Sequence, residues 1–254
     1  MNWIATYTLL SKEVTRWRKV WLQTVLAPVV TALLYLLVFG HVLEGRVEVF
    51  PGVSYTEFLI PGLLMMAVIQ NAFANTSSSI IQSKVMGSIV FILLPPFSAL
   101  EMFLAFIGAA ILRGLAVGVG VFLLAYFYVG VSIENIFVIL AFAVLGSYVM
   151  AALGLIAGMW AEKFDQIASF QSFLIVPLTF LSGVFYSITS LPPFWYQMSK
   201  ANPFFYMIDG FRYGFFGQSD QPVLLSLAVM LSASVVLTLG CVLMLKSGYK
   251  LRDA

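Results

Sequence analysis

The segment Leu191–Gly217, which reads LPPFWYQMSKANPFFYMIDGFRYGFFG, decides how the end of this chain folds. Pro192, Pro193 and Pro203 interrupt the segment, so it cannot form one continuous membrane helix. Its many aromatic residues are equally unsuited to a loop in water. Backbone that is not helical persists at membrane depth only where protein or a water-filled cavity surrounds it. We therefore expect a re-entrant helical hairpin that dips into the membrane edge and turns back.

The composition of the whole chain is that of a membrane protein. Of its 254 residues, 61% are apolar and only 9% are charged, which is more apolar surface than a water-soluble domain can bury. We predict an all-α polytopic membrane protein. The net charge of +2 comes with no basic cluster beyond short groups near the membrane, so we expect no binding of nucleic acid.

Six apolar stretches are long enough to cross a bilayer, which takes about 20 residues per helix. Because the connections between them are short, we expect one membrane domain, residues 22–250, behind a separate N-terminal segment, residues 1–21. The predicted spans are residues 22–43, 58–81, 102–129, 135–160, 167–188 and 221–245.

Lysine and arginine are distributed unevenly between the two sides that these spans define. Cytoplasmic segments of membrane proteins carry an excess of these residues. With both termini in the cytoplasm, the inside group is Lys12, Arg16, Arg18, Lys19, Lys84, Lys163, Lys246, Lys250 and Arg252, and the outside group is Arg46, Lys200 and Arg212. We therefore predict a multi-pass plasma-membrane protein, in the inner membrane if the cell is Gram-negative, with cytoplasmic termini.

The N-terminal segment has the pattern of an amphipathic helix in the cytoplasmic headgroup layer. Apolar residues recur every three or four positions and share one face, whereas charged residues occupy the other. The apolar face comprises Trp3, Tyr7, Leu10, Val14, Trp17 and Trp21, and the charged face comprises Lys12, Glu13, Arg16 and Lys19. Two interpretations remain open: a plain membrane anchor, or an anchor whose charged face also touches a cytoplasmic partner.

The connection after the second span, residues 82–100, predicts a second surface helix. Its apolar residues rest on the membrane, its polar residues face the cytosol, and a double proline ends it before the third span. The membrane-facing residues are Ile89, Leu93 and Leu94, the cytosolic residues are Lys84 and Ser88, and the prolines are Pro95 and Pro96. The segment is either a simple intracellular turn or an element on which another protein pushes.

Signals of enzymatic chemistry are nearly absent. The chain contains one histidine, His41, without the HExxH pattern or another ligand set of a metal site. It contains no GxSxG, GxxxxGK[ST] or GxGxxG motif, so it has no P-loop with which to hydrolyse ATP. We predict no catalytic residue, no metal site and no cofactor within this chain.

Arg113 is the charge that we place deep in the membrane. It follows Glu101 by roughly 18 Å along a helix, and a buried arginine is costly unless it is paired or hydrated. No carboxylate lies as deep, because Glu57, Glu134 and Glu162 also fall at span ends. That absence disfavours a carrier coupled to an ion gradient. Arg113 is either a structural residue at an interface or a contact for an anionic substrate.

Polar and aromatic residues mark the second and fifth spans. Polar groups within a membrane must face protein or water, so those of the second span either line a pathway or hold helices together. The aromatic residues of the fifth span either pack or bind substrate. The residues that we single out for a pathway are Gln70, Asn71 and Asn75 of the second span and Phe173, Phe180 and Ser182 of the fifth.

The order of these parts resembles the type-2 ABC exporter permeases (the ABC-2 family) over nearly the whole chain. The shared features are the amphipathic first helix, six spans, a short helix after the second span and a re-entrant segment before the sixth. The residues that carry the likeness are Leu191-Pro192-Pro193, Asn202-Pro203, Tyr206, Arg212 and the run Ser182-Gly183-Val184-Phe185.

This resemblance implies a partner and a division of labour. A separate ABC ATPase subunit would bind ATP and Mg, and the permease would form a homodimer or a pseudo-dimer within the membrane lipids. The residues implied in coupling to the ATPase are Lys84, Gly87, Ser88, Ile89, Pro95, Pro96, Glu13 and Arg16. The re-entrant residues Pro192, Pro193, Asn202, Pro203, Tyr206 and Arg212 would close the outer end of the path. The segment 87–97 departs from the family in carrying no charge.

The sequence thus predicts the membrane subunit of an ATP-driven exporter for an amphiphilic or hydrophobic substrate, such as a lipid, a lipid-linked glycan or a drug. Two alternatives stay open: a secondary carrier coupled to an ion gradient, and a membrane scaffold that transports nothing.

Overall fold

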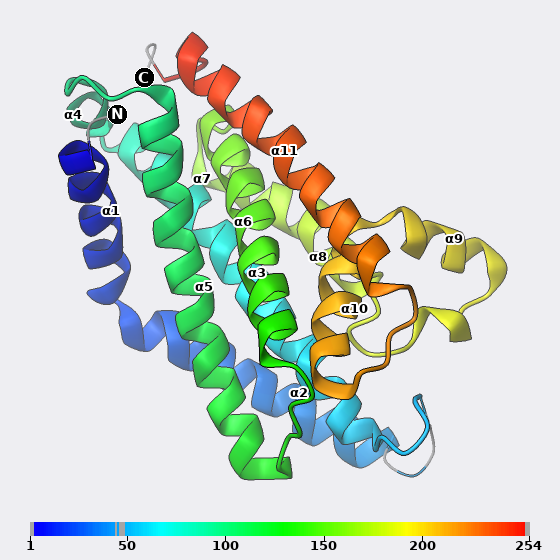
Figure 1. The fold of residues 1–254 in the computed structure, drawn as a ribbon. Coiled ribbons are helices and arrows are strands. Elements are labelled where there is room, and N and C mark those ends of the chain that lie inside the picture. Colours follow the sequence, from blue (N-terminus) through cyan, green and yellow to red (C-terminus); the bar gives the residue numbers. More distant parts are fainter. Residues whose placement is uncertain (1–2, 44, 46–48, 252–254) are drawn as a thin grey trace.

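The computed structural model describes residues 3–43, 45 and 49–251, and these form a bundle of helices (Figure 1). Arg46 and Arg252, which entered the charge count, lie outside the described residues. The helices are α1 (Trp3–Arg18), η1 (Leu22–Leu26), α2 (Ala27–Leu43), α3 (Tyr55–Val85), α4 (Ile89–Leu93), α5 (Ala99–Val129), α6 (Ile136–Trp160), α7 (Phe164–Phe170), η2 (Gln171–Ile175), α8 (Val176–Phe180), η3 (Ile188–Ser190), α9 (Pro193–Ala201), α10 (Pro203–Phe216) and α11 (Val223–Ser247).

Five helices in the described part of the chain are long and apolar enough to cross a membrane. They are η1 with α2 (Leu22–Leu43), α3, α5, α6 and α11, and they match five of the six predicted spans. The remaining predicted span, the fifth in chain order (residues 167–188), is not confirmed. The helical segment there begins at Phe164 as α7, continues through η2 and ends with α8 at Phe180. The chain then turns at Gly183, whose φ of +77° favours glycine.

Helix α3 is the centre of the bundle, and it packs against α5, α6, α2 and α10. In its most apolar window 78% of the residues are buried, against 11% in α11, so α11 lies at the periphery. Glycines permit the close approach of α6 to α3. A Cβ on Gly154 would lie 2.4 Å from the carbonyl oxygen of Phe73, and one on Gly158 would lie 3.1 Å from that of Ser77. Small residues bring membrane helices together in this way.

Two of the glutamates expected at span ends, Glu57 and Glu101, act there as helix caps. Ser54 and Glu57 form a capping box at the start of α3, and Ser98 and Glu101 form another at the start of α5. Each box satisfies backbone N–H groups that the first helical turn leaves without partners. These carboxylates are therefore structural.

Helix α1 packs along α5 and reaches α3, with Leu10 against Gly108. The predicted placement of Glu13 on an accessible charged face is wrong, because Glu13 is fully buried, whereas Trp3 and Tyr7 of the apolar face are each 70% exposed. The buried side of α1 faces α5 and α3, and Glu13 lies on it because Lys12 and Arg16 compensate its charge. Both cations are close to Glu13 in the sequence, but the sequence does not reveal that other helices cover this side.

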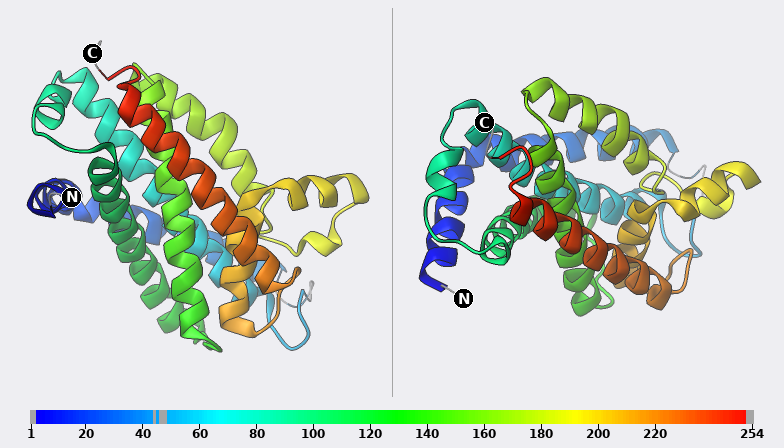
Figure 2. Two further views of the ribbon diagram at one scale, coloured as in Figure 1. Left: turned by 45° about the horizontal axis from the view of Figure 1, so that its top comes forward. Right: turned by 90° about the horizontal axis from the view of Figure 1, so that it is seen from above.

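Different elements lie at the two ends of the bundle. The start of α1, the short helix α4 and the end of α11 gather at one end, and the α5–α6 and α10–α11 connections lie at the other (Figure 1). The segment Leu191–Gly217 forms α9 and α10, joined at Asn202, and Figure 2 shows α9 standing out from the side of the bundle.

Candidate functional site

A polar stripe is the accessible side of the central helix α3. Between Phe58 and Lys84, every residue of α3 is buried except five. Their spacing repeats every fourth position, which places them on one helical face. Four of the five are polar, although α3 is long and apolar enough to span a membrane. We call this face the α3 stripe: Gln70, Asn71, Ala74, Ser78 and Gln82.

A pocket of about 300 Å³ adjoins the stripe between α3 and the η1–α2 segment. Gln70 and Asn71 line it from α3, and Gln23 and Thr31 line it from the other side. In the described part of the chain, the side-chain amides of Gln23 and Gln70 bond to no other group. The pocket therefore offers free hydrogen-bonding groups.

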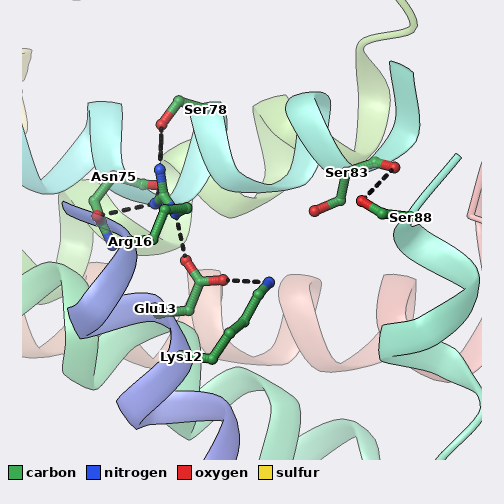
Figure 3. Close-up of polar contacts among 7 residues, drawn as sticks. All are labelled: Lys12, Glu13, Arg16, Asn75, Ser78, Ser83 and Ser88. Atoms are coloured by element: carbon green, nitrogen blue, oxygen red, sulfur yellow. Dashed lines mark hydrogen bonds and ion pairs between the residues drawn. The ribbon is translucent and has the colours of Figure 1, made fainter. Parts of the chain in front are cut away.

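A charged cluster from α1 borders the stripe on the side of Ser78 (Figure 3). The Arg16 guanidinium donates to the backbone oxygen of Asn75 over 2.8 Å, to Asn75 Oδ1 over 3.1 Å and to Ser78 Oγ over 3.4 Å. Glu13 accepts from Arg16 over 3.0 Å and from Lys12 over 2.9 Å. Burial alone would raise the pKa of Glu13, but the charges of Arg16 and Lys12 outweigh burial and lower it. Glu13 is therefore ionised at neutral pH.

Arg113 on α5 reaches the same stripe. Its Nη2 donates to Asn71 Oδ1 over 3.2 Å, and its Nε is buried without an acceptor. No carboxylate among the described residues forms an ion pair with it. The structure thus brings together Gln70, Asn71, Asn75 and Arg113 from the predicted set.

The residues predicted to contribute to a path from the fifth span lie differently. Phe173 is 84% exposed, and Phe180 stacks against Phe185 with ring centroids 5.5 Å apart. Ser182 is buried and donates to the backbone oxygen of Thr179. The structure gives none of the three a contact with the α3 stripe.

The short helix α4 differs from its predicted arrangement. Lys84 was expected to face the cytosol and Ile89 to rest on the membrane, but both are buried. Lys84 Nζ donates to the backbone oxygens of Met159 over 2.9 Å and Ala161 over 2.5 Å, so it stabilises the C-terminal end of α6. Two other apolar residues of this segment, Phe91 and Leu94, are 74% and 71% exposed.

Other members of the predicted coupling group surround α4. Gly87 has a φ of +67°, and Ser88 Oγ donates to the backbone oxygen of Ser83 over 3.4 Å. Pro95 and Pro96 are exposed directly after the helix. Helix α4 and the two prolines that follow it therefore present a short, uncharged and largely apolar surface.

The hairpin residues are mainly helix caps. Pro192 and Pro193 begin α9, and Pro203 begins α10. Asn202 Oδ1 accepts from the backbone N–H of Phe204, and its Nδ2 donates to the backbone oxygen of Leu178 over 2.6 Å, which ties the hairpin to α8. Tyr206 closes the turn by donating its hydroxyl to the backbone oxygen of Lys200 over 2.9 Å.

Arg212, predicted in the re-entrant hairpin and counted with the outside group, is fully buried in α10. Its Nη2 donates to the backbone oxygen of Gly183 over 2.9 Å, and the guanidinium lies 3.9 Å from the ring centroid of Phe58. The arginine thus joins three separate parts of the fold. A buried charge survives in this way when the backbone and an aromatic ring replace water.

Sequence reasoning missed the carboxylates of this region. Asp209 is buried and accepts from the backbone N–H groups of Asp220 and Gln221 over 2.8 and 3.0 Å. Asp220 in turn accepts from the backbone N–H of Ile188 over 3.0 Å. The one available signal was the spacing of Asp209 and Arg212 on a single helical face.

An apolar helical bundle, whose central helix keeps one polar face accessible, defines a multi-pass membrane protein with a candidate transport path. The sequence profile of the ABC-2 type transporters matches residues 4–216, and the chain belongs to this family of membrane permeases.

The chain is 37% identical to the inner membrane transport permease YadH of Escherichia coli K12 over 253 residues, which cover 100% of this chain and 99% of YadH. It is 24% identical to nodulation protein J of Rhizobium leguminosarum bv. viciae over 238 residues, 91% of this chain and 88% of that protein.

Proposed function

We propose that this chain is the permease subunit of an ATP-driven exporter and moves an amphiphilic or hydrophobic substrate. A separate ABC ATPase binds ATP and Mg, and the permease acts as a homodimer in the inner membrane with both termini in the cytoplasm. The observation that carries this proposal is the α3 stripe. A polar face on a membrane helix needs protein or water beside it, and in one copy of the chain the stripe is accessible.

A second copy of the permease supplies the missing wall. Two chains that face each other across their α3 stripes enclose a polar path between them. The free side-chain amides of Gln70 and Gln23 then offer hydrogen bonds to a polar head group. The apolar tail of the substrate stays in contact with apolar helix surface.

The end that carries α4 is the docking surface for the ATPase. Phe91 and Leu94 project from α4, and no charge lies between Gly87 and Phe97. Apolar contacts therefore dominate the docking. Movement of α4 passes to α6 through Lys84, which bonds to the backbone at the end of that helix.

The opposite end holds the outer gate. Helices α9 and α10 form the re-entrant hairpin, and the segment from Phe164 to Phe180 completes the six crossings. Asn202 and Arg212 bind the hairpin to the backbone at Leu178 and Gly183. Opening of this gate therefore moves α10 together with the end of α8.

Reconstitution in lipid vesicles tests this function. The permease is purified with the ABC ATPase that binds it, and the export of fluorescent lipid analogues is measured with and without ATP. We expect export to require ATP, to stop when the P-loop lysine of the ATPase is replaced, and to survive dissipation of the ion gradients. Transport without ATP that collapses with an ion gradient would establish a secondary carrier. The absence of any transport and of any bound ATPase would favour a scaffold.

A further inference from the structure

Arg113 has hydrogen-bonding capacity that the protein does not use. It lies about 21 Å along α5 from Ala99, near the middle of a helix that is long enough to span a membrane. A guanidinium carries five N–H donors. Within the part of the chain that the structure describes, one neutral acceptor, Asn71 Oδ1, receives a hydrogen bond from Arg113.

The charge around Arg113 is positive. Arg16 bonds to Asn75 and Arg113 bonds to Asn71, one turn earlier on α3, so both guanidinium groups contact the same stretch of that helix. Glu13, the acidic residue of the cluster, already accepts from Lys12 and Arg16. An unneutralised arginine at membrane depth is costly and usually functional, so the region favours an additional anion.

Neighbouring donors lack acceptors as well. Trp17 Nε1 and Asn75 Nδ2 are buried without partners. Helix α1 runs beside α5, with Leu10 against Gly108 and Val25 against Gly120, which brings Trp17 to the level of Arg113. A ligand that complements this region is therefore rich in acceptor oxygens.

The pocket beside Asn71 gives such a ligand room. Its volume of about 300 Å³ equals roughly ten water molecules of the liquid. An anion is a stronger acceptor for a guanidinium than a neutral amide, because charge-assisted hydrogen bonds are about twice as strong. Phosphate also matches the fork of a guanidinium.

We propose that Arg113 binds the phosphate group of an anionic amphiphile that enters through the adjoining pocket, which Asn71 lines and Arg113 does not, and that the phosphate replaces Asn71 Oδ1 as the acceptor of Arg113. At mid-membrane depth, such a head group belongs to an amphiphile in transit, so this inference rests on the proposed function and narrows its substrate class. Free inorganic phosphate offers the same oxygens, and the experiment separates these two sources.

Native mass spectrometry of the full-length permease in neutral detergent tests the site without ATPase or ATP. The probes are dioleoylphosphatidic acid and dioleoylglycerol, which share both acyl chains and differ in the phosphate. We expect the wild type to bind phosphatidic acid, and Arg113→Gln to bind it roughly tenfold more weakly or worse. Dioleoylglycerol should bind equally to both proteins. Arg18→Gln removes an exposed arginine of α1 that takes no part in this cluster and should change nothing.

A misfolded Arg113→Gln protein would also bind phosphatidic acid weakly. A second variant, Asn71→Ala, is therefore measured, because here binding is expected not to weaken. It removes the competing acceptor, so phosphatidic acid should bind at least as tightly as to the wild type. Equal binding of phosphatidic acid to the wild type and to Arg113→Gln would overturn the proposal, as would weaker binding to Asn71→Ala. Displacement of the lipid by millimolar inorganic phosphate would assign the site to the free ion instead. Because no transport is measured, failure of the exporter function would not produce these results.

Discussion

Glu13, Lys84 and Arg212 carry charges into the interior of the bundle, with 0%, 8% and 1% of their surfaces exposed. Each has partners that replace water: two cations for Glu13, two backbone oxygens for Lys84, and a backbone oxygen with an aromatic ring for Arg212. Removing one member of a buried charge pair lowers the stability of the protein far more than removing one member of an exposed pair, because the remaining charge stays buried without a partner.

Glu13→Gln should therefore destabilise the protein. It leaves Arg16 without its carboxylate, and we expect the free energy of unfolding to fall by about 3 kcal/mol. The measurement is denaturant unfolding of the purified permease in detergent. Lys12→Gln is the matched control, because the Lys12 side chain is 47% exposed and its loss should cost less than about 1 kcal/mol. Equal losses for the two variants would contradict the role assigned to Glu13.

The same pair predicts a pH dependence. The pKa of Glu13 in the folded protein lies below its ordinary value of 4.5, so its stabilisation is present above pH 4.5 and is lost as the pH falls through the lowered pKa. The difference in stability between wild type and Glu13→Gln should thus be constant from pH 7 to pH 5 and shrink below pH 4. A difference that grows in acid would show that Glu13 is not stabilised as the anion.

Residue-level patterns located some of these groups and misjudged others. Gln70, Asn71 and Asn75 were found because polar side chains in an apolar span are conspicuous. The burial of Glu13 and Lys84 was missed, since charge alone predicts exposure. The contacts that fix them in the interior reach far along the chain: Arg16, the partner of Glu13, bonds to Asn75, and Lys84 bonds to Met159. Such pairings are set by the packing of helices, which the local sequence does not encode.

Among the elements, α3 and α6 approach each other closely at glycines of α6. Gly154→Ala would place a Cβ 2.3 Å from Thr76 Oγ1 and 2.4 Å from the carbonyl oxygen of Phe73. We expect a loss of about 1–3 kcal/mol from overpacking, measured as a lower unfolding midpoint. Gly240→Ala on α11 is the control, because its nearest neighbour would lie at 3.8 Å. Tolerance of both substitutions would contradict this packing.

Helix α4 is the element whose proposed role is easiest to separate from folding. Phe91→Asp changes a side chain that is 74% exposed, so the permease should fold and insert normally. Co-purification of the ABC ATPase should fall at least severalfold, because a charge replaces an apolar docking contact. Ile133→Asp alters an exposed residue in the α5–α6 connection at the opposite end and should retain the ATPase. Full ATPase recovery with Phe91→Asp would assign docking elsewhere.

The sequence predicts helical elements well where an apolar run is long and uninterrupted. The bounds of α3, α5, α6 and α11 lie within a few residues of the predicted spans. The end of the helix within residues 167–188 was harder to predict, because α8 ends at Phe180 and the chain turns at Gly183 although the residues that follow are still apolar. There, bonds from Asn202 and Arg212 fix the backbone, and both donors lie in a later segment.

At the scale of the whole molecule, one helix is buried on every side but one. The apolar residues of α3 contact its neighbours within the chain, and its polar stripe is left for a partner or for water. Composition showed that polar residues occur in this span, but only the assembled bundle shows that they share the accessible face. The proposed homodimer, in which a second copy covers this face, would explain why an otherwise apolar helix carries polar residues there.

Cysteine accessibility tests the central claim, a water-filled path along α3, most directly. The background is a chain in which the buried Cys241, the single native cysteine, is replaced by alanine. Single cysteines are introduced as Ala74→Cys and Gln82→Cys on the stripe, and as Val235→Cys on α11, where the native side chain is 60% exposed. A charged, water-soluble maleimide should label both stripe positions in native membranes and leave the α11 position, which faces lipid, unlabelled. Failure to label the stripe, or labelling of all three positions to the same extent, would contradict a path along α3.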